Sequence, residues 1–416
     1  MRRFMTLAAV TAAALAAASA ALASPYVRYG VQDDAWLRYG SGTLDERAAT
    51  LKSLGTDVVR YTLVWRELEP RRGVYDWRSA DAVLGALHAH GIAPVVTLWG
   101  TPAWANGGRP ANWAPTSAST FAAFAKAAAK RYPYVRRWLV WNEPNKAPFL
   151  RPTSARTYVR QLLNPAYAAI HAANRRALVG GGVTGPIAGA GGVSPVAFIQ
   201  QMGRYHARLD AYAHNPYPAR PRTETPTSGG CARCATITMA TLDKLLYWVG
   251  REWGGKRIWL TEYGYQTNPP DRWLGVSAAA QAHYASEAAL KAYEAPRVDM
   301  LIHYLVRDDR ELAGWQSGLL TAAGSAKPSY RAFALPLAQR SRRGLRTVVW
   351  GQVRPRTGRQ PYRLQQFRGG HWHWVGGNRW TSGRGFFSAA VRAGRGSKLR
   401  VWSPRDRSYG TILVVR

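Results

Sequence analysis

Eight strand-like apolar runs, separated by helix-like segments, occupy about the first three quarters of the 416-residue chain. Between the runs, apolar residues recur with helical spacing, as in Leu242, Leu245, Leu246 and Val249. Strands that alternate with helices indicate parallel βαβ units. The runs span residues 26–31, 57–65, 93–99, 137–141, 177–183, 209–214, 257–262 and 301–306.

The number of units and the lengths of the linkers favour a closed barrel over an open doubly wound sheet. Eight units are the number that closes a (β/α)8 TIM barrel. A glycine-rich phosphate-binding turn is typical of doubly wound sheets, and the glycine run at 180–182 lacks the spacing of such a turn. The linkers after the strands are long, at residues 100–115, 216–236, 266–275 and 307–327. Because the loops after the strands build the active site of such barrels, we expect the functional residues there.

The composition changes after residue 339. Residues 340–416 hold 18 Lys and Arg residues and one acidic residue, Asp406, so half of the net charge of +34 lies in this segment. We therefore predict an α/β barrel domain at 24–339 and a small all-β, sandwich-like accessory domain at 340–416. Short alternating runs between turn residues predict its strands at 347–350, 362–367, 371–375, 385–391, 398–402 and 411–415.

The positive charge raises the question of nucleic-acid binding. A hydrophobic content of 47% excludes a mainly disordered polycation. The basic segment shows no recognition helix, zinc spacing or RNP-type aromatic pair, so we expect no nucleic-acid partner. His371 and His373 would share one face of a strand, but no third ligand accompanies them, and we expect no metal. Two explanations of the charge stay open: attachment to an anionic cell-wall or extracellular polysaccharide, or an Arg enrichment that reflects genome composition.

The N-terminus has the pattern of a secretory signal peptide. Arg2 and Arg3 precede a long uncharged run rich in Ala, and residues 21–23 form a small-x-small cleavage site. We expect residues 1–23 to be removed and the mature protein to be secreted, extracellular or associated with the cell surface. No later run offers the length of a transmembrane anchor. A retained N-terminal anchor is the alternative.

The only two cysteines, Cys231 and Cys234, lie in the long linker after the sixth run. A zinc site would need about two more ligands, and no second cysteine pair or nearby histidine supplies them. The flanking segment does not resemble the strand–helix turn of a redox motif. In an exported protein we expect a local disulfide that closes part of the loop.

Two glutamates stand at the ends of two of the predicted strands. The run at 137–141 ends in Asn142-Glu143-Pro144, where the proline cannot continue a central strand. The run at 257–262 ends in Thr261-Glu262. Strand ends on one face of a barrel meet in one cleft, and two carboxylates there match the needs of glycosidic bond cleavage. One carboxyl acts as a neutral acid, and in a retaining enzyme the other is an ionised nucleophile.

These motifs together resemble those of the clan A glycoside hydrolases. The similarity rests on Asn142-Glu143-Pro144, on Thr261-Glu262-Tyr263-Gly264, on the segment 60–77 after the second strand, and on the segment 318–333 before the last helix. It covers roughly residues 26–337 and is closest to the cellulase-like family five and the β-xylosidase-like family thirty-nine. The C-terminal segment is similar to small β modules appended to secreted glycan-active barrels.

The resemblance implies a role for several residues at the strand ends. Glu143 would be the acid/base and Glu262 the nucleophile. Asn142 would bond to the sugar 2-hydroxyl, an interaction that strengthens in the transition state. Arg60 would lie beside Glu262 and keep it ionised. A purely structural ion pair is the alternative for Arg60.

Further residues are candidates for binding the sugar. His214 and Tyr217 would orient the nucleophile and contact the sugar, although His214 fits equally well as a structural histidine of the barrel. Trp99 is a candidate stacking platform. The sequence departs from the family pattern at the eighth strand, where many relatives carry a Trp under the reactive sugar. Here the segment is 303–309, and we expect Tyr304 or Arg307 to take part.

The sequence therefore predicts a secreted retaining β-glycoside hydrolase that acts on a polysaccharide or oligosaccharide and needs no metal or organic cofactor. Two alternatives stay open. The first is a transglycosylase that remodels a cell-surface glycan with the same residues. The second is a catalytically silent glycan-binding protein that keeps the barrel.

Overall fold

A computed structural model of the chain describes residues 24–416, and the predicted signal peptide lies outside them. The eight predicted runs form eight parallel strands, with β1 paired to both β2 and β8, so the barrel is closed. The predicted (β/α)8 TIM barrel is thus confirmed. Its strands are β1 (Arg28–Gln32), β2 (Val58–Val64), β3 (Ala93–Trp99), β4 (Arg137–Val140), β5 (Leu178–Thr184), β6 (Ala211–His214), β7 (Arg257–Tyr263) and β8 (Val298–Tyr304).

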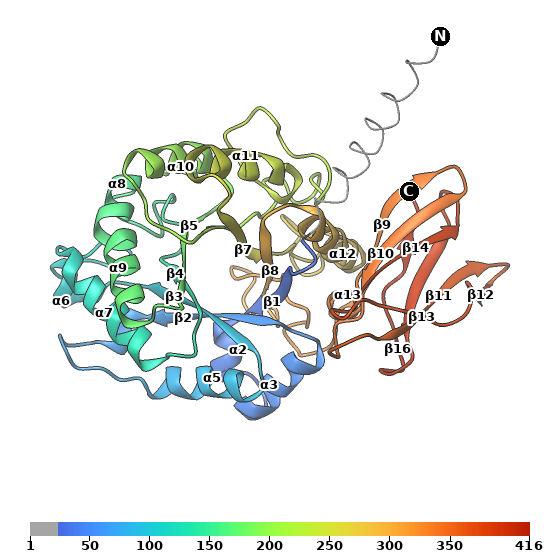
Figure 1. Ribbon diagram of the computed structural model, residues 1–416, viewed down its shortest axis with the longest axis horizontal. Coiled ribbons are helices and arrows are strands. Elements are labelled where there is room, and N and C mark those ends of the chain that lie inside the picture. The colour runs from blue at the N-terminus through green and yellow to red at the C-terminus, as the bar shows by residue number, and fades with distance from the viewer. Residues whose placement is uncertain (1–23) are drawn as a thin grey trace, which may run out of the picture.

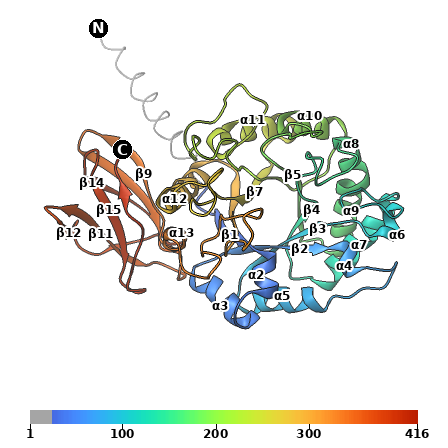
Figure 2. The same cartoon turned by 180° about the vertical axis from the view of Figure 1, so that it is seen from behind.

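Helices surround the strands on the outside (Figures 1 and 2). Each buries an apolar stripe against the barrel, as Leu242, Leu245 and Val249 do in α11. The helical segments are α2 (Asp34–Tyr39), α3 (Leu44–Ser53), α4 (Trp65–Leu68), α5 (Arg78–Ala89), α6 (Ala103–Asn106), α7 (Ala118–Arg131), α8 (Ala155–Thr157), η1 (Tyr158–Leu163), α9 (Asn164–Ala173), α10 (Pro195–Arg204), η2 (Met239–Thr241), α11 (Leu242–Trp253), α12 (Ala278–Glu294) and α13 (Pro328–Ala334).

The glycines of β5 have a packing role. A Cβ atom at Gly180 would lie 2.8 Å from the indole ring of Trp259 and 2.7 Å from Leu139. Trp259 belongs to the apolar cluster inside the barrel, together with Leu139 and Met300. A larger residue at Gly180 would clash with this indole, since real Cβ atoms do not approach so closely.

The C-terminal domain consists of two antiparallel sheets packed face to face, which confirms the predicted all-β accessory domain. One sheet has the order β14-β10-β9 and the other β12-β11-β15-β16, with β13 and β17 at its edges. The expected boundary between residues 339 and 340 falls inside β9, which begins at Leu337. The strands are β9 (Leu337–Arg343), β10 (Arg346–Gln352), β11 (Pro361–Arg368), β12 (His371–Trp374), β13 (Arg379–Trp380), β14 (Phe386–Arg392), β15 (Lys398–Ser403), β16 (Ser408–Tyr409) and β17 (Leu413–Val414).

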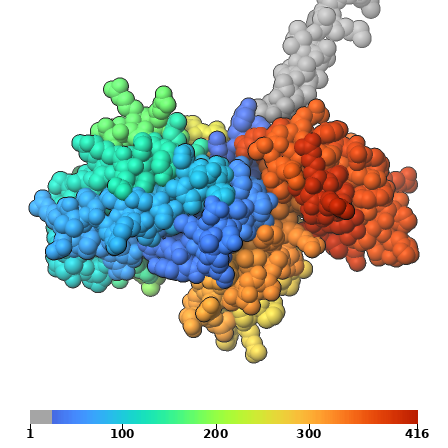
Figure 3. Space-filling model, turned by 90° about the horizontal axis from the view of Figure 1, so that it is seen from below, coloured from blue at the N-terminus to red at the C-terminus, as the bar shows by residue number. Residues whose placement is uncertain are grey.

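The C-terminal domain lies beside the barrel, next to α12 and α13 (Figures 1 and 3). Trp350 and Phe386, from the three-stranded sheet, belong to the same buried cluster as the barrel core, and both rings pack on Tyr293 of α12. The other face of this sheet, with Val349 and Phe387, meets the six-stranded sheet in a second core. The three-stranded sheet therefore lies between the barrel and the six-stranded sheet.

Two further predictions were a disulfide in the loop after β6 and the lack of a membrane-spanning segment after the signal peptide. Cys231 and Cys234 form the predicted disulfide, with Cα atoms 5.4 Å apart. Among residues 24–416, no helix has the length and apolar character needed to cross a membrane.

Candidate active site

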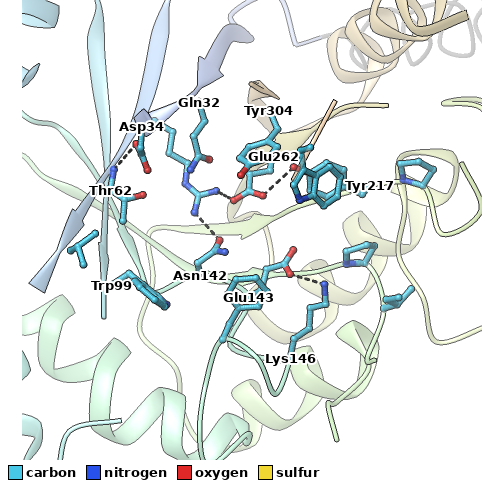
Figure 4. A pocket seen from close by; sticks show the side chains of 17 residues that line it. Gln32, Asp34, Thr62, Trp99, Asn142, Glu143, Lys146, Tyr217, Glu262 and Tyr304 are labelled. Carbon is cyan, nitrogen blue, oxygen red and sulfur yellow. Dashed lines mark hydrogen bonds and ion pairs between the residues drawn. The ribbon is translucent and has the colours of Figure 1, made fainter. Parts of the chain in front are cut away.

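A cavity of about 460 Å³ opens at the carboxyl ends of the barrel strands, where the long loops lie (Figure 4). All eight strands, or the residues just after them, contribute to its wall. Glu143 and Glu262 both line it, so the fold brings together the two predicted catalytic carboxyls from β4 and β7. The lining residues are Gln32, Asp34, Arg60, Thr62, Val64, Trp99, Asn142, Glu143, Lys146, Phe149, Pro186, Ile187, Tyr217, Pro218, Glu262, Tyr304 and Trp315.

The backbone just after β4 adopts an unusual conformation that aims Glu143 into the cavity. Trp141 has a φ of 71° and Glu143 a φ of 40°, in the left-handed region that non-glycine residues rarely occupy. Hydrogen bonds to both neighbouring strands hold this segment, from the Trp141 N–H to the Leu98 carbonyl and from the Glu143 N–H to the Val183 carbonyl, each 2.9 Å long. Strain of this kind costs about 1–3 kcal/mol per residue and is concentrated at functional sites.

The Glu143 carboxyl has one polar partner on each oxygen. Lys146 Nζ lies 2.8 Å from Oε2, and Asn215 Nδ2 donates to Oε1 at 3.2 Å. Asn215 is itself fixed by the Thr261 hydroxyl, which donates to Asn215 Oδ1 at 2.8 Å. The side chain of Glu143 is thus held by residues that follow β4 and β6, the second of them fixed in turn by β7, while its carboxyl faces the cavity.

Glu262 has a different set of partners. Arg60 Nη1 donates to Oε1 at 2.5 Å, and the Tyr217 hydroxyl donates to Oε2 at 3.1 Å. The pKa of the Glu262 carboxyl is raised above its ordinary value by burial and by the neighbouring Glu143, and the Arg60 guanidinium and the Tyr217 hydroxyl offset part of this rise. The pKa of Tyr217 itself is raised well above its ordinary value by burial, so this phenol stays a donor.

Arg60 connects the two halves of the site. Its side chain is 1% exposed, and besides Glu262 it donates to Asn142 Oδ1 and to the Thr97 hydroxyl, both at 2.8 Å. A buried guanidinium with partners in several directions is held in one position. The structure thus shows Arg60 beside Glu262, as predicted. The same guanidinium binds Asn142 through its amide oxygen, which leaves the amide nitrogen to face a sugar.

An aromatic wall closes one side of the cavity. Tyr304, at the end of β8, has its ring centroid 5.7 Å from that of Trp315 in an edge-to-face arrangement, and Tyr217 lies 5.1 Å from Trp315. Trp315 comes from the middle of the long loop after β8. The family pattern led us to look for a Trp in the strand itself, and here the indole is supplied by the loop.

A buried ion pair anchors the loop that carries Trp315. Lys327 Nζ lies 2.7 Å from the Asp308 carboxylate and donates to the Gln316 carbonyl at 2.9 Å. Asp308 also accepts from the Gly318 N–H at 2.8 Å. The lysine and aspartate side chains are only 5% and 3% exposed, respectively. The two ends of the loop are therefore tied together beneath Trp315.

We expect a Lys327→Met variant to be less stable by about 3–5 kcal/mol, because it leaves the Asp308 charge buried without its partner. Its kcat/KM is expected to fall as well, because the loop that presents Trp315 loses its anchor. Urea unfolding and steady-state kinetics measure the two effects. The double variant Lys327→Met/Asp308→Leu removes both charges and should recover most of the stability; recovery of none would contradict this account.

His214 does not reach the cavity, which corrects the expectation that it contacts the sugar. The side chain is fully buried, with Nδ1 2.8 Å from the Thr184 hydroxyl and Nε2 3.0 Å from the Ile237 carbonyl. Burial lowers its pKa to about 4, so the ring is neutral at ordinary pH. His214 ties β5 and β6 to the following loop.

A His214→Gln variant is expected to lose less stability on acidification than the wild type. The pKa of His214 is lowered to about 4 in the folded protein. Its stabilising contribution is therefore present above about pH 6.5 and is lost as the pH falls towards 4, by roughly 3 kcal/mol. Denaturant melts between pH 7 and pH 4.5 measure this slope, with His371→Gln, an exposed position, as the control. If the free energy of unfolding of His214→Gln depends on pH as it does in the wild type, the buried neutral state of His214 is contradicted.

Arg307, one of the two alternatives expected at the eighth strand, does not line the cavity. Its N–H donates to Asp33 Oδ2 at 3.0 Å, and its backbone pairs with Leu320. Of the two candidates at this strand, Tyr304 is the one in the cavity wall. Trp99, the predicted platform at the end of β3, is also part of the wall.

Several residues of the cavity were not predicted. Gln32 is the last residue of β1 and Asp34 lies two positions after it, so the strand-end argument used for the glutamates would have found them. Asn215 follows the end of β6 and bonds to Glu143 without lining the cavity, and the same argument would have found it. Lys146 and Trp315 lie within loops, where neither spacing nor strand ends indicate them.

Part of the barrel matches the model of a glycosidase family. Residues 34–120 match the model of glycoside hydrolase family 42, described as beta-galactosidase. The matched segment runs from the end of β1 into α7. No curated protein matches the chain.

Solved structures of glycoside hydrolases share the fold. A family 39 enzyme from the gut symbiont Bacteroides cellulosilyticus WH2 has a TM-score of 0.62 at 17% identity, covering 93% of this chain and 80% of its own. The family 39 enzyme from Xanthomonas axonopodis pv. citri has a TM-score of 0.59 at 15% identity, covering 92% and 95%. A GH5_18 enzyme from Streptomyces cattleya has a TM-score of 0.56 at 19% identity, covering 74% and 79%.

The predicted resemblance to clan A glycoside hydrolases is thereby confirmed. The matches to the two family 39 structures extend beyond the barrel into the C-terminal domain, because residues 24–336 alone make up only about three quarters of the chain. The combination of this barrel with this β domain is therefore shared with other glycosidase structures.

Proposed function

We propose that the protein is a retaining β-glycoside hydrolase in which Glu143 is the acid/base and Glu262 the nucleophile. The observation that carries this proposal is the unequal surroundings of two carboxyls in one cavity. Glu262 is held by the Arg60 guanidinium and the Tyr217 hydroxyl, which favour an ionised nucleophile. Glu143 has different partners, the Lys146 ammonium from its own loop and the Asn215 amide from the segment after β6.

In the first step Glu262 attacks the anomeric carbon while Glu143 gives its proton to the leaving oxygen. The glycosidic bond breaks as an ester bond to Glu262 forms. In the second step Glu143, now a carboxylate, takes a proton from water, which attacks the same carbon and releases Glu262. The 2.8 Å contact with Lys146 holds the Glu143 carboxyl in position in the cavity.

The remaining polar groups of the cavity are suited to binding a sugar. Asn142 reaches the 2-hydroxyl beside the reacting carbon, as the resemblance implies. The carboxylate of Asp34 accepts from the Thr62 N–H at 3.1 Å, and its other oxygen is available to sugar hydroxyls. Tyr304 and Trp315 supply aromatic surface for the apolar face of the ring.

The names of the related structures support a β-linked substrate. The S. cattleya structure is described as a complex with Manβ1-4GlcNAc. Another structure with a TM-score of 0.51 is described as an exo-β-1,4-mannosidase from an Opitutaceae bacterium. We propose a polysaccharide or oligosaccharide with β-linked sugars as the substrate of this protein.

The experiment that tests the proposal is a panel of chromogenic β-glycosides and dyed polysaccharides, with the product followed by proton NMR. We expect release of sugar in the β configuration before mutarotation. The α anomer as first product would exclude the retaining mechanism, and no hydrolysis across the panel would count against the proposed activity.

We further propose that the protein acts outside the cell. The signal-like segment at 1–23 supports export, and so does the Cys231–Cys234 disulfide, which is stable in an oxidising compartment. Detection of the intact enzyme, shortened by its first 23 residues, in the culture medium or cell wall would test this proposal.

A further inference from the structure

The six-stranded sheet of the C-terminal domain has an outer face that combines aromatic and cationic side chains. Along β11 and β15, every second side chain points inward, and these side chains, such as Leu364 and Val401, form the core of the domain. Their neighbours in sequence point outward because successive side chains of a strand lie on opposite faces. We call the outward set the outer face: Arg363, Gln365, Phe367, Trp372, Trp374, Lys398, Arg400, Trp402 and Tyr409.

The strand register places these residues side by side. Gln365 of β11 lies opposite Trp374 of β12 on one side and Arg400 of β15 on the other. Phe367 lies likewise between Trp372 and Lys398. Rings and cations from four neighbouring strands therefore form one continuous surface.

The cations lie directly over the rings. The Arg363 guanidinium is 3.7 Å from the centroid of Trp374, and the Arg400 guanidinium is 4.1 Å from Trp372 and 3.7 Å from Tyr409. Gln365 accepts from Arg400 Nε at 2.8 Å. These contacts hold the guanidiniums in position before any ligand arrives, which lowers the entropy cost of binding.

No carboxylate neutralises the outer face. Within residues 24–416, Arg363, Lys398 and Arg400 form no ion pair. Asp406, the acidic residue of this domain, is already paired with Arg356 at 2.8 Å. The positive charge of the outer face is therefore available to an external anion.

The β11 and β12 part of the outer face is not used in packing the two domains together, whereas Arg400 and Tyr409 line a hollow shared with α12 and α13 of the barrel. The barrel contacts the three-stranded sheet, and β11 and β12 lie at the side of the molecule away from the barrel (Figure 1). Trp374 is 41% exposed and Phe367 36%. Exposed large aromatic side chains beside unpaired cations are typical of binding surfaces.

We propose that the outer face binds a carboxylated polysaccharide chain, independently of the active site. Aromatic rings pack on the apolar faces of pyranose rings, and a guanidinium binds a carboxylate with two parallel hydrogen bonds. Rings and guanidiniums that lie in contact on one surface suit a polymer whose sugars carry carboxylates. A neutral glycan would leave the cations unpaired, and a nucleic-acid duplex offers no exposed ring faces to the rings.

The test uses the full chain with Glu262→Gln, so that binding is measured without hydrolysis. The probe is polygalacturonate, and its methyl-esterified form serves as the uncharged counterpart. Trp374→Ala leaves the net charge unchanged and is expected to weaken binding to polygalacturonate about tenfold. Arg363→Gln/Lys398→Gln is expected to weaken it by a similar factor and to reduce its salt dependence.

The matched control is Arg343→Gln/Arg346→Gln. These two exposed arginines are paired across β9 and β10 of the other sheet, and neither lies over an aromatic ring. This control removes the same charge and is expected to change the affinity less than twofold. An equal loss in the control pair would show that charge alone is responsible and would overturn the proposal.

Two further outcomes would also overturn it: equal binding of the methyl-esterified polymer, or equally tight binding of duplex DNA at the same salt concentration. Melting temperatures verify that each variant is folded. When the outer-face substitutions are made in a chain that keeps Glu262, the variants should hydrolyse a small aryl glycoside at the wild-type rate. Failure of the proposed hydrolysis and failure of polymer binding are thus observed separately.

Discussion

A Glu262→Gly variant is expected to hydrolyse an aryl β-glycoside at least about 10⁴-fold more slowly than the wild type, because no covalent intermediate can form without the nucleophile. The chain should still fold. Arg60 keeps its hydrogen bonds to Asn142 and Thr97, and water can enter the open cavity where the carboxylate was. Steady-state kinetics and circular dichroism measure the two properties.

Added azide distinguishes the role of nucleophile from a merely structural role of Glu262. In Glu262→Gly, azide fits the space left by the side chain and should restore turnover by forming the α-glycosyl azide. The control Glu67→Gly removes a carboxylate that pairs with Arg38 at the surface and should keep normal activity. Undiminished hydrolysis by Glu262→Gly would refute the mechanism.

A Glu143→Ala variant should show a loss that depends on the leaving group. For an alkyl or sugar leaving group, which needs protonation, we expect a fall of about 10²–10⁴-fold. For dinitrophenolate, which leaves without a proton, formation of the glycosyl-enzyme should be nearly unaffected while its hydrolysis becomes slow. A burst of dinitrophenolate followed by slow turnover is the expected observation.

In Glu143→Ala, the anomeric configuration of the azide product should show which face of the sugar Glu143 occupies. It takes the place of the general base and attacks the glycosyl-enzyme from the β face, so the product is the β-glycosyl azide. The two variants thus give azides of opposite configuration. The same anomer from both would contradict the assignment of the two roles.

The order of strands and the meeting of the two strand-end carboxyls could be predicted because they depend on local patterns. A strand buried on both faces is a continuous apolar run, and in a parallel barrel every strand ends at the same face. Glu143 and Glu262 each end such a run, so their meeting follows from topology alone. The beginning of β9 was missed because only Leu337 and Ala338 of that strand are apolar, and the rest is polar and mostly exposed.

Which side chains reach the cavity could not be predicted in the same way. His214 and Tyr217 lie three residues apart in one segment, yet Tyr217 bonds to Glu262 while His214 is enclosed between Thr184 and Ile237. Trp315 enters the site from a loop whose path is fixed by the Lys327–Asp308 pair. Contacts of this kind depend on packing between distant segments.

The sequence by itself determined the barrel, the all-β domain and the two strand-end carboxyls, because periodicity and strand direction are properties of short segments. Only the tertiary structure decided the partners of each carboxyl, the exclusion of His214 and Arg307 from the cavity, and the gathering of rings and cations on one face of the C-terminal sheet. The physical reason is that the direction of a loop side chain, and the register between strands far apart in the chain, are set by the packing of the whole fold.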